Sequence, residues 1–231
     1  MRNIIFSEGE YYHVYNRGVE KRNLFSDQED YERFLESMTA FNTVEPIGSL
    51  YELSFTENNH LATRSPSEPL VEIVAYCLNP NHFHILLKQV EENGVSQFMK
   101  RLGGGYSWYF NNKHRRSGTL FQGPFRAKHI ETNEYLLRLS AYINLNDQVH
   151  SLGDQVAKYG KSITSWESYS ENNSSKQKAV PQGLFAVNCS KDIILGQFSS
   201  VLEYKKFALE TLSLIREGKE MERQLATLSF D

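Results

Sequence analysis

Two histidines flank one phenylalanine in the stretch LNPNHFHILLK, residues 78–88. On a β-strand, residues two apart project from the same face, with their Cα atoms about 6.5 to 7 Å apart. His82 and His84 would then converge on one point, while Phe83 packs on the other side. Two imidazoles with open positions suit a divalent ion that also takes oxygen ligands. Histidines on a strand are more often ordinary polar residues, so the pair alone leaves both interpretations open.

The stretch RLSAYINLN, residues 138–146, could supply the groups that the histidine pair lacks. Tyr142 and Asn146 are four residues apart, so on a helix they would share one face about one turn apart. A tyrosine hydroxyl can attack a phosphodiester when a metal withdraws charge from the phosphate. Asn146 could then complete the metal shell. In the structural alternative, Tyr142 packs at the core edge and Asn146 caps the end of the helix.

Residues 98–130 carry seven lysines and arginines and no aspartate or glutamate. The net charge of the chain is −3, but the charge of one face matters more for polyanion binding than the total. Tyr106, Trp108 and Tyr109 could stack on unpaired bases if they are exposed. In the alternative, the charges only solvate a helix and a loop. The DNA contacts that we expect in this segment are Lys100, Arg101, Tyr106, Lys113, Arg115, Arg116, Arg126 and Lys128.

The composition is that of an ordinary globular protein, with 231 residues, 40% of them apolar and 23% charged. No stretch approaches the roughly 18 consecutive apolar residues of a membrane helix, and the first residues contain no secretory signal. We therefore expect a cytoplasmic protein that does not bind membranes. Cys77 and Cys189 lie far apart without metal-binding spacing, which argues against a zinc site and against a disulfide framework.

The elements that must position these residues can be read from periodicity and turn residues. Residues 11–18 alternate as a strand before a turn at Asn16-Arg17-Gly18, and residues 26–41 read as a helix with Ser26 as its N-cap. Residues 42–70 read as a loop that could contain a short strand at 50–55. The runs at 70–78 and 82–88, joined by Asn-Pro-Asn, predict a β-hairpin that carries the two histidines.

Helices are expected to dominate the rest of the chain. Residues 94–114 form one, with Ser96 as its cap, although three consecutive glycines indicate either a break or a close approach to the backbone. A short strand is expected within 115–130. Residues 132–146 form a strong helix that begins at Thr132 or Asn133. A polar linker covers 153–183, and the last two helices cover 190–198, capped by Ser190, and 201–225.

Four motifs in this order resemble the single-tyrosine HUH transposases, and especially the branch of REP-associated tyrosine transposases. They are YHVYNRG at 12–18, NPNHFHILL at 79–87, the basic segment at 98–128, and YLLRLSAYINLN at 135–146. Each motif alone is common, whereas the ordered set is specific. The resemblance spans most of the first 150 residues.

The resemblance implies an α+β fold, with a ferredoxin-like core whose antiparallel sheet is flanked by helices and with a helical C-terminal extension. Residues 1–150 would form the transposase domain and residues 151–231 a linker and helical extension. His82, His84 and Asn146 would hold Mg²⁺ or Mn²⁺. Tyr142 would cut single-stranded DNA beside a hairpin, becoming joined to the 5′ phosphate and leaving a free 3′ hydroxyl. Asn16 and Arg17 of the first motif would contact DNA.

Two positions depart from the pattern of the family. Asn146 is followed by Asp147, where the family usually has proline, and related insertion-sequence transposases often carry glutamine in place of Asn146. Other readings also stay open: a non-catalytic protein that binds hairpin DNA or RNA, or a nuclease of the replication-initiator or relaxase type, which shares the histidine pair. A homodimer is possible in this family, and nothing in the chain decides it.

Overall fold

A computed structural model describes residues 4–48, 50, 68–149, 162–170 and 187–228 of the chain. The short strand that the sequence suggests at 50–55 therefore lies almost entirely outside the described residues. Among the helices that are described, none is long and apolar enough to cross a membrane.

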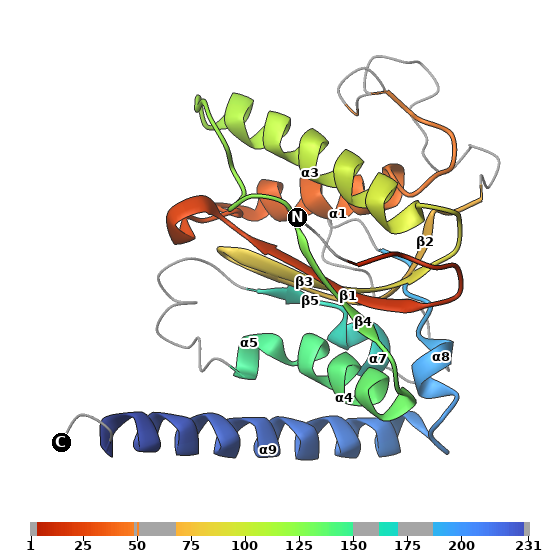
Figure 1. The fold of residues 1–231 in the computed structure, drawn as a ribbon, viewed down its shortest axis with the longest axis vertical. Coiled ribbons are helices and arrows are strands. Elements are labelled where there is room, and N and C mark those ends of the chain that lie inside the picture. Colours follow the sequence, from red (N-terminus) through yellow and green to blue (C-terminus); the bar gives the residue numbers. More distant parts are fainter. Residues whose placement is uncertain (1–3, 49, 51–67, 150–161, 171–186, 229–231) are drawn as a thin grey trace.

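Within the described residues, five antiparallel strands form one sheet in the order β4-β1-β3-β2-β5 (Figure 1). Their chain order with the intervening helices is β1-α1-β2-β3-α3-β4. The arrangement is the ferredoxin-like pattern, extended at one edge by β5, and it confirms the fold class expected from the sequence. The strands are β1 (Tyr11–Arg17), β2 (Val71–Asn79), β3 (His82–Gln89), β4 (Arg126–Ile130) and β5 (Ile163–Thr164).

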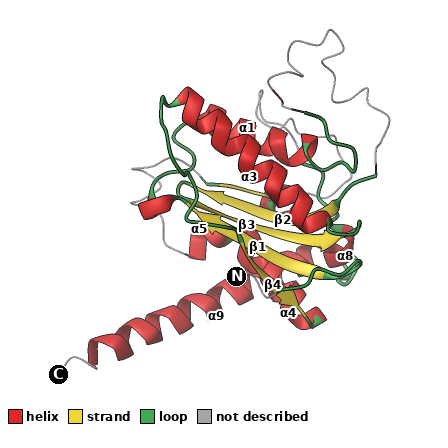
Figure 2. Cartoon of the chain, turned by 45° about the horizontal axis from the view of Figure 1, so that its top comes forward, coloured by secondary structure: helices red, strands yellow, loops and turns green. Residues whose placement is uncertain are grey.

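Helices cover both faces of the sheet (Figure 1). Helices α1 (Gln28–Ala40) and α3 (Gly94–Lys113) lie on one face, and α4 (Asn133–Asn144) lies on the other. Helix α9 (Val201–Leu228) packs along α4 and extends beyond the sheet (Figure 2). The short elements are η1 (Val19–Lys21), α5 (Asn146–Val149), α7 (Trp166–Ser170) and α8 (Asp192–Leu195).

The helix boundaries follow from their capping residues, and three expected caps are wrong: Ser26, Ser96 and Ser190. For Ser190, the N-cap position of α8 is taken by Lys191 instead. Helix α1 begins after Asp27, whose carboxylate accepts from the Asp30 N–H at 3.1 Å, so Ser26 lies outside the helix. Helix α3 begins after Asn93, which adopts a left-handed conformation and makes no side-chain cap, so Ser96 lies inside it. Thr132 caps α4 as expected, by accepting from the Tyr135 N–H at 3.2 Å.

The three consecutive glycines do not break α3, which runs continuously through them. A Cβ atom at Gly105 would lie 2.6 Å from the Phe41 ring, so this glycine lets an aromatic side chain approach the helix backbone. Of the two possibilities that the sequence offered, the close approach is the one observed. Gly103 and Gly104 have more space around them, and Gly104 has no atom within 4 Å of such a Cβ.

A bulge in β2 decides which side chains face which helix layer. The pairing with β3 shifts by one residue between Ile73 and Ala75. Before the shift, Ile73 packs toward α1 and α3, whereas Ala75 after it packs toward α4. A bulge inserts one extra residue in one strand and so reverses the alternation beyond it. Asn79 therefore lies opposite His82, on the face that α4 covers.

The two faces of the sheet bury separate hydrophobic clusters. Phe83 and its neighbours pack against α1 and α3, and Leu86 packs against α4 and α9. Burying a side chain of this size stabilises a fold by about 1.5 to 3 kcal/mol. Cys77 and Cys189 are both buried free thiols, as expected from their spacing.

Part of the segment expected as a linker is ordered and packs on the sheet. Residues 163–164 form β5, and the Tyr169 hydroxyl of α7 donates to the Val74 carbonyl at 2.7 Å. The helix expected at 190–198 is shorter, because α8 covers only Asp192–Leu195. The division into domains at residue 150 stays a prediction.

Candidate active site

The two histidines project from the same face of β3, as the alternation predicts. Their ring centroids lie 5.2 Å apart with the rings perpendicular, and both side chains are partly exposed. Phe83 between them is 2% exposed and belongs to the core on the opposite face. Strand β2 adds two polar neighbours to this face, because Cys77 pairs with His84 and Asn79 pairs with His82.

Helix α4 brings Tyr142 to the same place. The Tyr142 ring centroid lies 5.8 Å from that of His84, and the two rings meet nearly at right angles. The apolar stripe of α4, including Leu139 and Ile143, packs on the sheet and leaves Tyr142 half-buried beside the histidines. Burial raises the pKa of Tyr142, and the neighbouring Asn146 amide partly offsets that rise.

Asn146 lies next to Tyr142, but it does not belong to the same helix. Helix α4 ends at Asn144, and Asn146 is the first residue of α5. Its side chain is fully buried, and its Oδ1 accepts from Asn79 Nδ2 at 2.8 Å. Among the described residues, its Nδ2 has no hydrogen-bond partner. A buried donor without a partner costs about 1 to 3 kcal/mol, so this amide is poised to bind a further group.

Asn79 connects the two sides of the site. Its Nδ2 donates to Asn146 Oδ1 and lies 2.9 Å from His82 Nε2, while its Oδ1 accepts from Ser162 Oγ at 2.9 Å. One buried amide therefore joins the hairpin, the start of α5 and the residue just before β5. We refer to His13, Asn79, His82, His84, Tyr142 and Asn146 as the tyrosine–histidine cluster.

Each histidine has its Nδ1 engaged by a neighbouring side chain. Asn81 Oδ1 lies 2.7 Å from His82 Nδ1, and His13 Nε2 lies 2.9 Å from His84 Nδ1. Burial and the nearby charge of Lys128 lower the pKa of His13 to about 4, so His13 is neutral near pH 7 and can accept. Metal-binding histidines usually have one ring nitrogen oriented in this way. The two imidazoles fit a divalent ion, provided that His82 Nε2 exchanges its contact with Asn79 Nδ2 for the ion.

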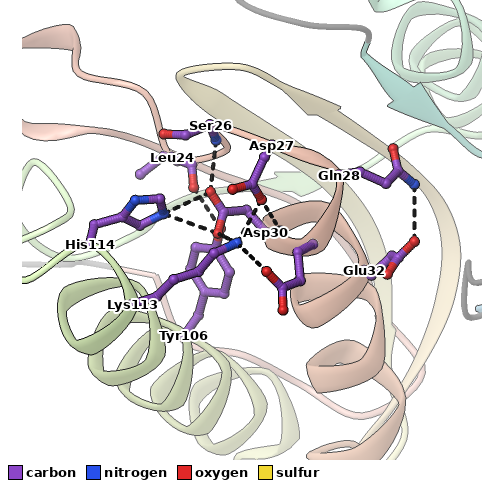
Figure 3. A network of polar contacts seen from close by, with 10 residues as sticks. Leu24, Ser26, Asp27, Gln28, Asp30, Glu32, Tyr106, Lys113 and His114 are labelled. Carbon is purple, nitrogen blue, oxygen red and sulfur yellow. Dashed lines mark hydrogen bonds and ion pairs between the residues drawn. The ribbon is translucent and has the colours of Figure 1, made fainter.

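A second group of ligand-type side chains lies on the other side of the sheet. Asp27, Asp30 and His114 place their ligand atoms within 4.8 Å of one another (Figure 3). The Lys113 ammonium already lies among the acids, 2.6 Å from Asp27, 2.9 Å from Glu29 and 3.0 Å from Asp30. Burial lowers the pKa of Lys113, but the hydrogen bonds that its ammonium donates to these carboxylates outweigh burial and raise that pKa.

Because this ammonium neutralises the acids, the group serves to join two helices rather than to bind a metal. Asp30 is completely buried and also accepts from the Ser26 N–H at 2.8 Å. His114 Nε2 lies 3.0 Å from the same carboxylate. We refer to Asp27, Glu29, Asp30, Lys113 and His114 as the lysine–aspartate cluster, which connects the first turn of α1 to the end of α3.

The structure corrects three of the expected DNA contacts in the basic segment. Tyr106 is 0% exposed and donates to the Leu24 carbonyl, so it cannot stack on a base. The ammonium of Lys113 is neutralised by three carboxylates. Arg101 donates to the carbonyls of Thr43 and Val44, so it holds the loop after α1. Trp108, by contrast, is 54% exposed.

Other cations of the segment remain exposed, and some lie near the tyrosine–histidine cluster. Arg126 pairs across the sheet with Tyr15, which in turn pairs with His84, so Arg126 shares the histidine face. Lys128 pairs with His13 on the same face. Arg17 pairs with His82 and donates to Gln122. Lys100 and Arg115 are exposed on and after α3, and Arg116 is held by Asn111 at 2.9 Å.

Asn16 lies on the opposite face of the sheet from the histidines. It pairs with Phe83, and its Nδ2 donates to the Gly123 carbonyl at 3.1 Å. This side chain holds the loop before β4 in place. A role for Asn16 at the cleaved bond would need the DNA to reach both faces of the sheet.

Sequence reasoning missed two residues of the cluster, His13 and Asn79, and also Ser162, which donates to Asn79. His13 alternates with Tyr15 in the first strand, and only the pairing of β1 with β3 places it beside His84. Asn79 reads as a turn residue, and the bulge in β2 gives it its orientation. Ser162 carries no signal at all, because it follows a polar segment remote from the site.

Comparison with known proteins supports the resemblance read from the motifs. Residues 57–146 match the family model described as IS200-like transposase, which confirms that resemblance. A solved structure described as a REP-associated tyrosine transposase bound to a REP hairpin is 12% identical, with a TM-score of 0.48. The match covers 87% of this chain and 95% of that one. No curated protein matches the chain.

Proposed function

With residues 57–146 matching the IS200-like transposase family, we propose that this protein cuts and rejoins single-stranded DNA beside hairpins. Tyr142 is the nucleophile, and His82 and His84 hold a divalent ion, Mg²⁺ or Mn²⁺. Asn146 supports both, and since its Oδ1 is engaged by Asn79, its contact with the ion runs through water. The ion would withdraw charge from the phosphate under attack.

One observation carries this proposal: two segments some 60 residues apart meet in a single hydrogen-bonded network. His82 contacts Asn79, Asn79 donates to Asn146, and the Asn146 side chain lies beside Tyr142. Tyr142 in turn contacts the ring of His84. A tyrosine at the core edge would need no such neighbours. The geometry therefore supports a nucleophile held beside two metal-ligand candidates.

The residues of the chain account for the exchange of bonds. The Tyr142 oxygen forms a bond to phosphorus, and the bond from phosphorus to the 3′ oxygen of the preceding sugar breaks. The phenolic proton passes to solvent as the new bond forms, and the 3′ oxygen gains a proton from solvent. Because one phosphodiester replaces another, the free 3′ hydroxyl can reverse the reaction and rejoin the strand.

The neighbouring charges suit a DNA strand that crosses this face. Arg126, Lys128 and Arg17 are exposed and lie on the same face of the sheet as the histidines. Lysine and arginine neutralise phosphates and make the affinity depend on salt. The unpaired Nδ2 of Asn146 is a donor that a phosphate oxygen or a water would satisfy.

Replacing Tyr142 by phenylalanine tests the proposal, because it removes only the hydroxyl. The substrate is an oligonucleotide with a hairpin taken from the DNA beside the gene, incubated with Mg²⁺ or Mn²⁺. We expect the wild type to form a covalent protein–DNA adduct that survives denaturation, and Tyr142→Phe to form none while it still binds DNA. Tyr135→Phe on the same helix is the matched control and should keep the adduct.

Two outcomes would overturn the proposal. An adduct in Tyr142→Phe would mean that another group is the nucleophile. Hairpin binding that chelator leaves unchanged, with no adduct for the wild type in either metal, would mean that the protein is a non-catalytic binding module. Cleavage confined to one replication origin would favour an initiator or relaxase.

A further inference from the structure

A pocket of about 280 Å³ lies on the face of the sheet opposite the histidines. Helix α3, the loop at 121–125 and the sheet form its walls. Its volume corresponds to about nine water molecules at their share of liquid volume, which suits one flat ring system rather than a peptide. The lining residues central to the argument are Asn16, Phe83, Lys100, Gly104, Phe121 and Phe125.

The glycines of α3 open this pocket. Gly103 and Gly104 both line it, and a Cβ at Gly104 would meet no atom within 4 Å. A glycine inside a helix costs up to about 1 kcal/mol relative to alanine, and packing explains that cost only at Gly105. The space beside Gly104 is open to a ligand that would lie against the bare backbone.

The walls are aromatic, and the rim is cationic. Phe121 and Phe125 are partly buried, and Phe121 meets Phe83 edge to face with centroids 6.0 Å apart. Lys100 is exposed at the rim, and no acidic residue belongs to the lining. The pocket therefore complements a molecule that combines a flat apolar group with negative charge.

The pocket lies directly behind the tyrosine–histidine cluster. Phe83, which lines it, is the residue between His82 and His84, and Asn16, which also lines it, is paired with Phe83. The loop at 121–125 is fixed to the end of β1, because the Gln122 N–H donates to the Arg17 carbonyl at 2.8 Å. A strand that leaves the histidine face past Arg17 would reach this pocket within a few nucleotides.

We propose that this pocket takes one unpaired base of the DNA strand that Tyr142 cuts, with the adjacent phosphate on Lys100. The inference rests on the proposed function and adds a base-binding site remote from the cleaved bond. Stacking on aromatic side chains accepts any base, since every base has an apolar face. An unpaired nucleotide matches the flat ring, the negative charge and the volume together.

Filling the pocket while leaving the cluster intact tests this site. Gly104→Leu places a side chain in the open space, and Asn112→Leu adds the same side chain elsewhere on α3. Binding is measured with Tyr142→Phe protein, so that no strand is cut. The probes are a single-stranded thymidine oligonucleotide of roughly 20 nucleotides and an oligonucleotide of the same length without bases.

We expect the Tyr142→Phe protein to prefer the oligonucleotide with bases, and Gly104→Leu to reduce that preference about tenfold. Asn112→Leu should leave the preference unchanged, and so should Gly104→Leu for the strand without bases. An unchanged preference in Gly104→Leu, with the fold intact by circular dichroism, overturns the proposal. Equal losses on both oligonucleotides would assign the effect to phosphate contacts and overturn it too.

The measurement also separates this inference from the proposed function. If wild-type protein forms no adduct but the preference for bases depends on Gly104, the pocket stands and the catalytic proposal fails. If the adduct forms and Gly104→Leu leaves the preference for bases unchanged, the catalytic proposal stands and the pocket proposal fails.

Discussion

The lysine–aspartate cluster and the tyrosine–histidine cluster both gather polar side chains from distant segments, but only one of them satisfies its own members. In the first, Asp30 receives hydrogen bonds from the Ser26 N–H, Lys113 and His114 (Figure 3). In the second, the Nδ2 of Asn146 is buried without a partner among the described residues. Both histidines there also stay partly exposed.

The difference shows how to separate a structural cluster from a chemical one. Ligand-type residues within reach of one another are not sufficient, because Asp27, Asp30 and His114 meet that condition around an ammonium. A chemical site is better recognised by oriented, partly exposed side chains beside a polar atom that has no hydrogen-bond partner. Strain or an unpaired group persists where a ligand or substrate completes the site.

Of the changes considered, removing both histidines of the tyrosine–histidine cluster should have the largest effect. It tests whether this cluster is a chemical site. We expect His82→Ala combined with His84→Ala to slow cleavage about ten-thousandfold, or about 5.5 kcal/mol, because the ion is lost. Titration with Mn²⁺ should show no binding at this site. Lys88→Ala on the same strand is the control, and it removes only an ion pair with Glu72. Unchanged Mn²⁺ binding would contradict the ligand assignment.

Removing the buried carboxylate of Asp30 tests whether the lysine–aspartate cluster serves only to stabilise the fold. We expect Asp30→Ala to lower the free energy of unfolding by about 3 to 5 kcal/mol, because Lys113 and His114 lose their buried partner. Asp27→Ala removes an exposed cap and should cost about 1 kcal/mol. Urea unfolding measures both. Adduct formation by folded Asp30→Ala should match the wild type, and a selective loss of cleavage would show that this cluster has a chemical role.

Asn79→Ala should weaken the tyrosine–histidine cluster without removing a ligand. Asn79 acts through His82 and Asn146, so we expect the affinity for Mn²⁺ to fall about 10- to 100-fold, as for other residues that orient metal ligands. Ser162→Ala removes one hydrogen bond to Asn79 and should have a smaller effect. Equal affinities in Asn79→Ala and the wild type would make Asn79 a purely structural residue.

The smallest expected effect concerns DNA affinity, and it distinguishes two cations of the basic segment, Arg126 and Lys113. Arg126→Gln should reduce the affinity for single-stranded DNA a few-fold and lower the slope against log salt by about 0.7, since one phosphate contact is lost. Lys113→Gln should leave that slope unchanged and instead destabilise the protein. Binding measured at several salt concentrations distinguishes them. A slope that responds to Lys113 rather than Arg126 would reverse this assignment.

Local patterns predicted the parts of the fold that depend on local physics. The hairpin that carries His82 and His84 followed from alternation and the turn at Asn-Pro-Asn, and the helix of Tyr142 followed from its apolar stripe. Helical spacing correctly predicted that Asn146 lies near Tyr142, although the predicted reason is wrong, because α4 ends at Asn144, before Asn146. The side chain lies beside Tyr142 because α5 begins directly after the Leu145 cap.

The residue roles that were missed or wrong depend on contacts between segments distant in the sequence, which local sequence patterns cannot reveal. Lys113 looked like a phosphate ligand because its neighbours in sequence include no acid, whereas its acidic partners come from α1. Tyr106 looked available for stacking because the burial of a tyrosine on a helix depends on what packs against it. The roles of His13 and Asn79 required the strand register.

The bulge in β2 sets a limit on how this site could be transplanted or redesigned. The residues before it belong to the core under α1 and α3, and Asn79 after it belongs to the cluster with His82. Deleting one residue there would turn Asn79 toward the wrong layer while β3 kept its histidines in place. A graft of the hairpin formed by β2 and β3 onto another scaffold must therefore carry Val74 with it, although Val74 lies outside the tyrosine–histidine cluster.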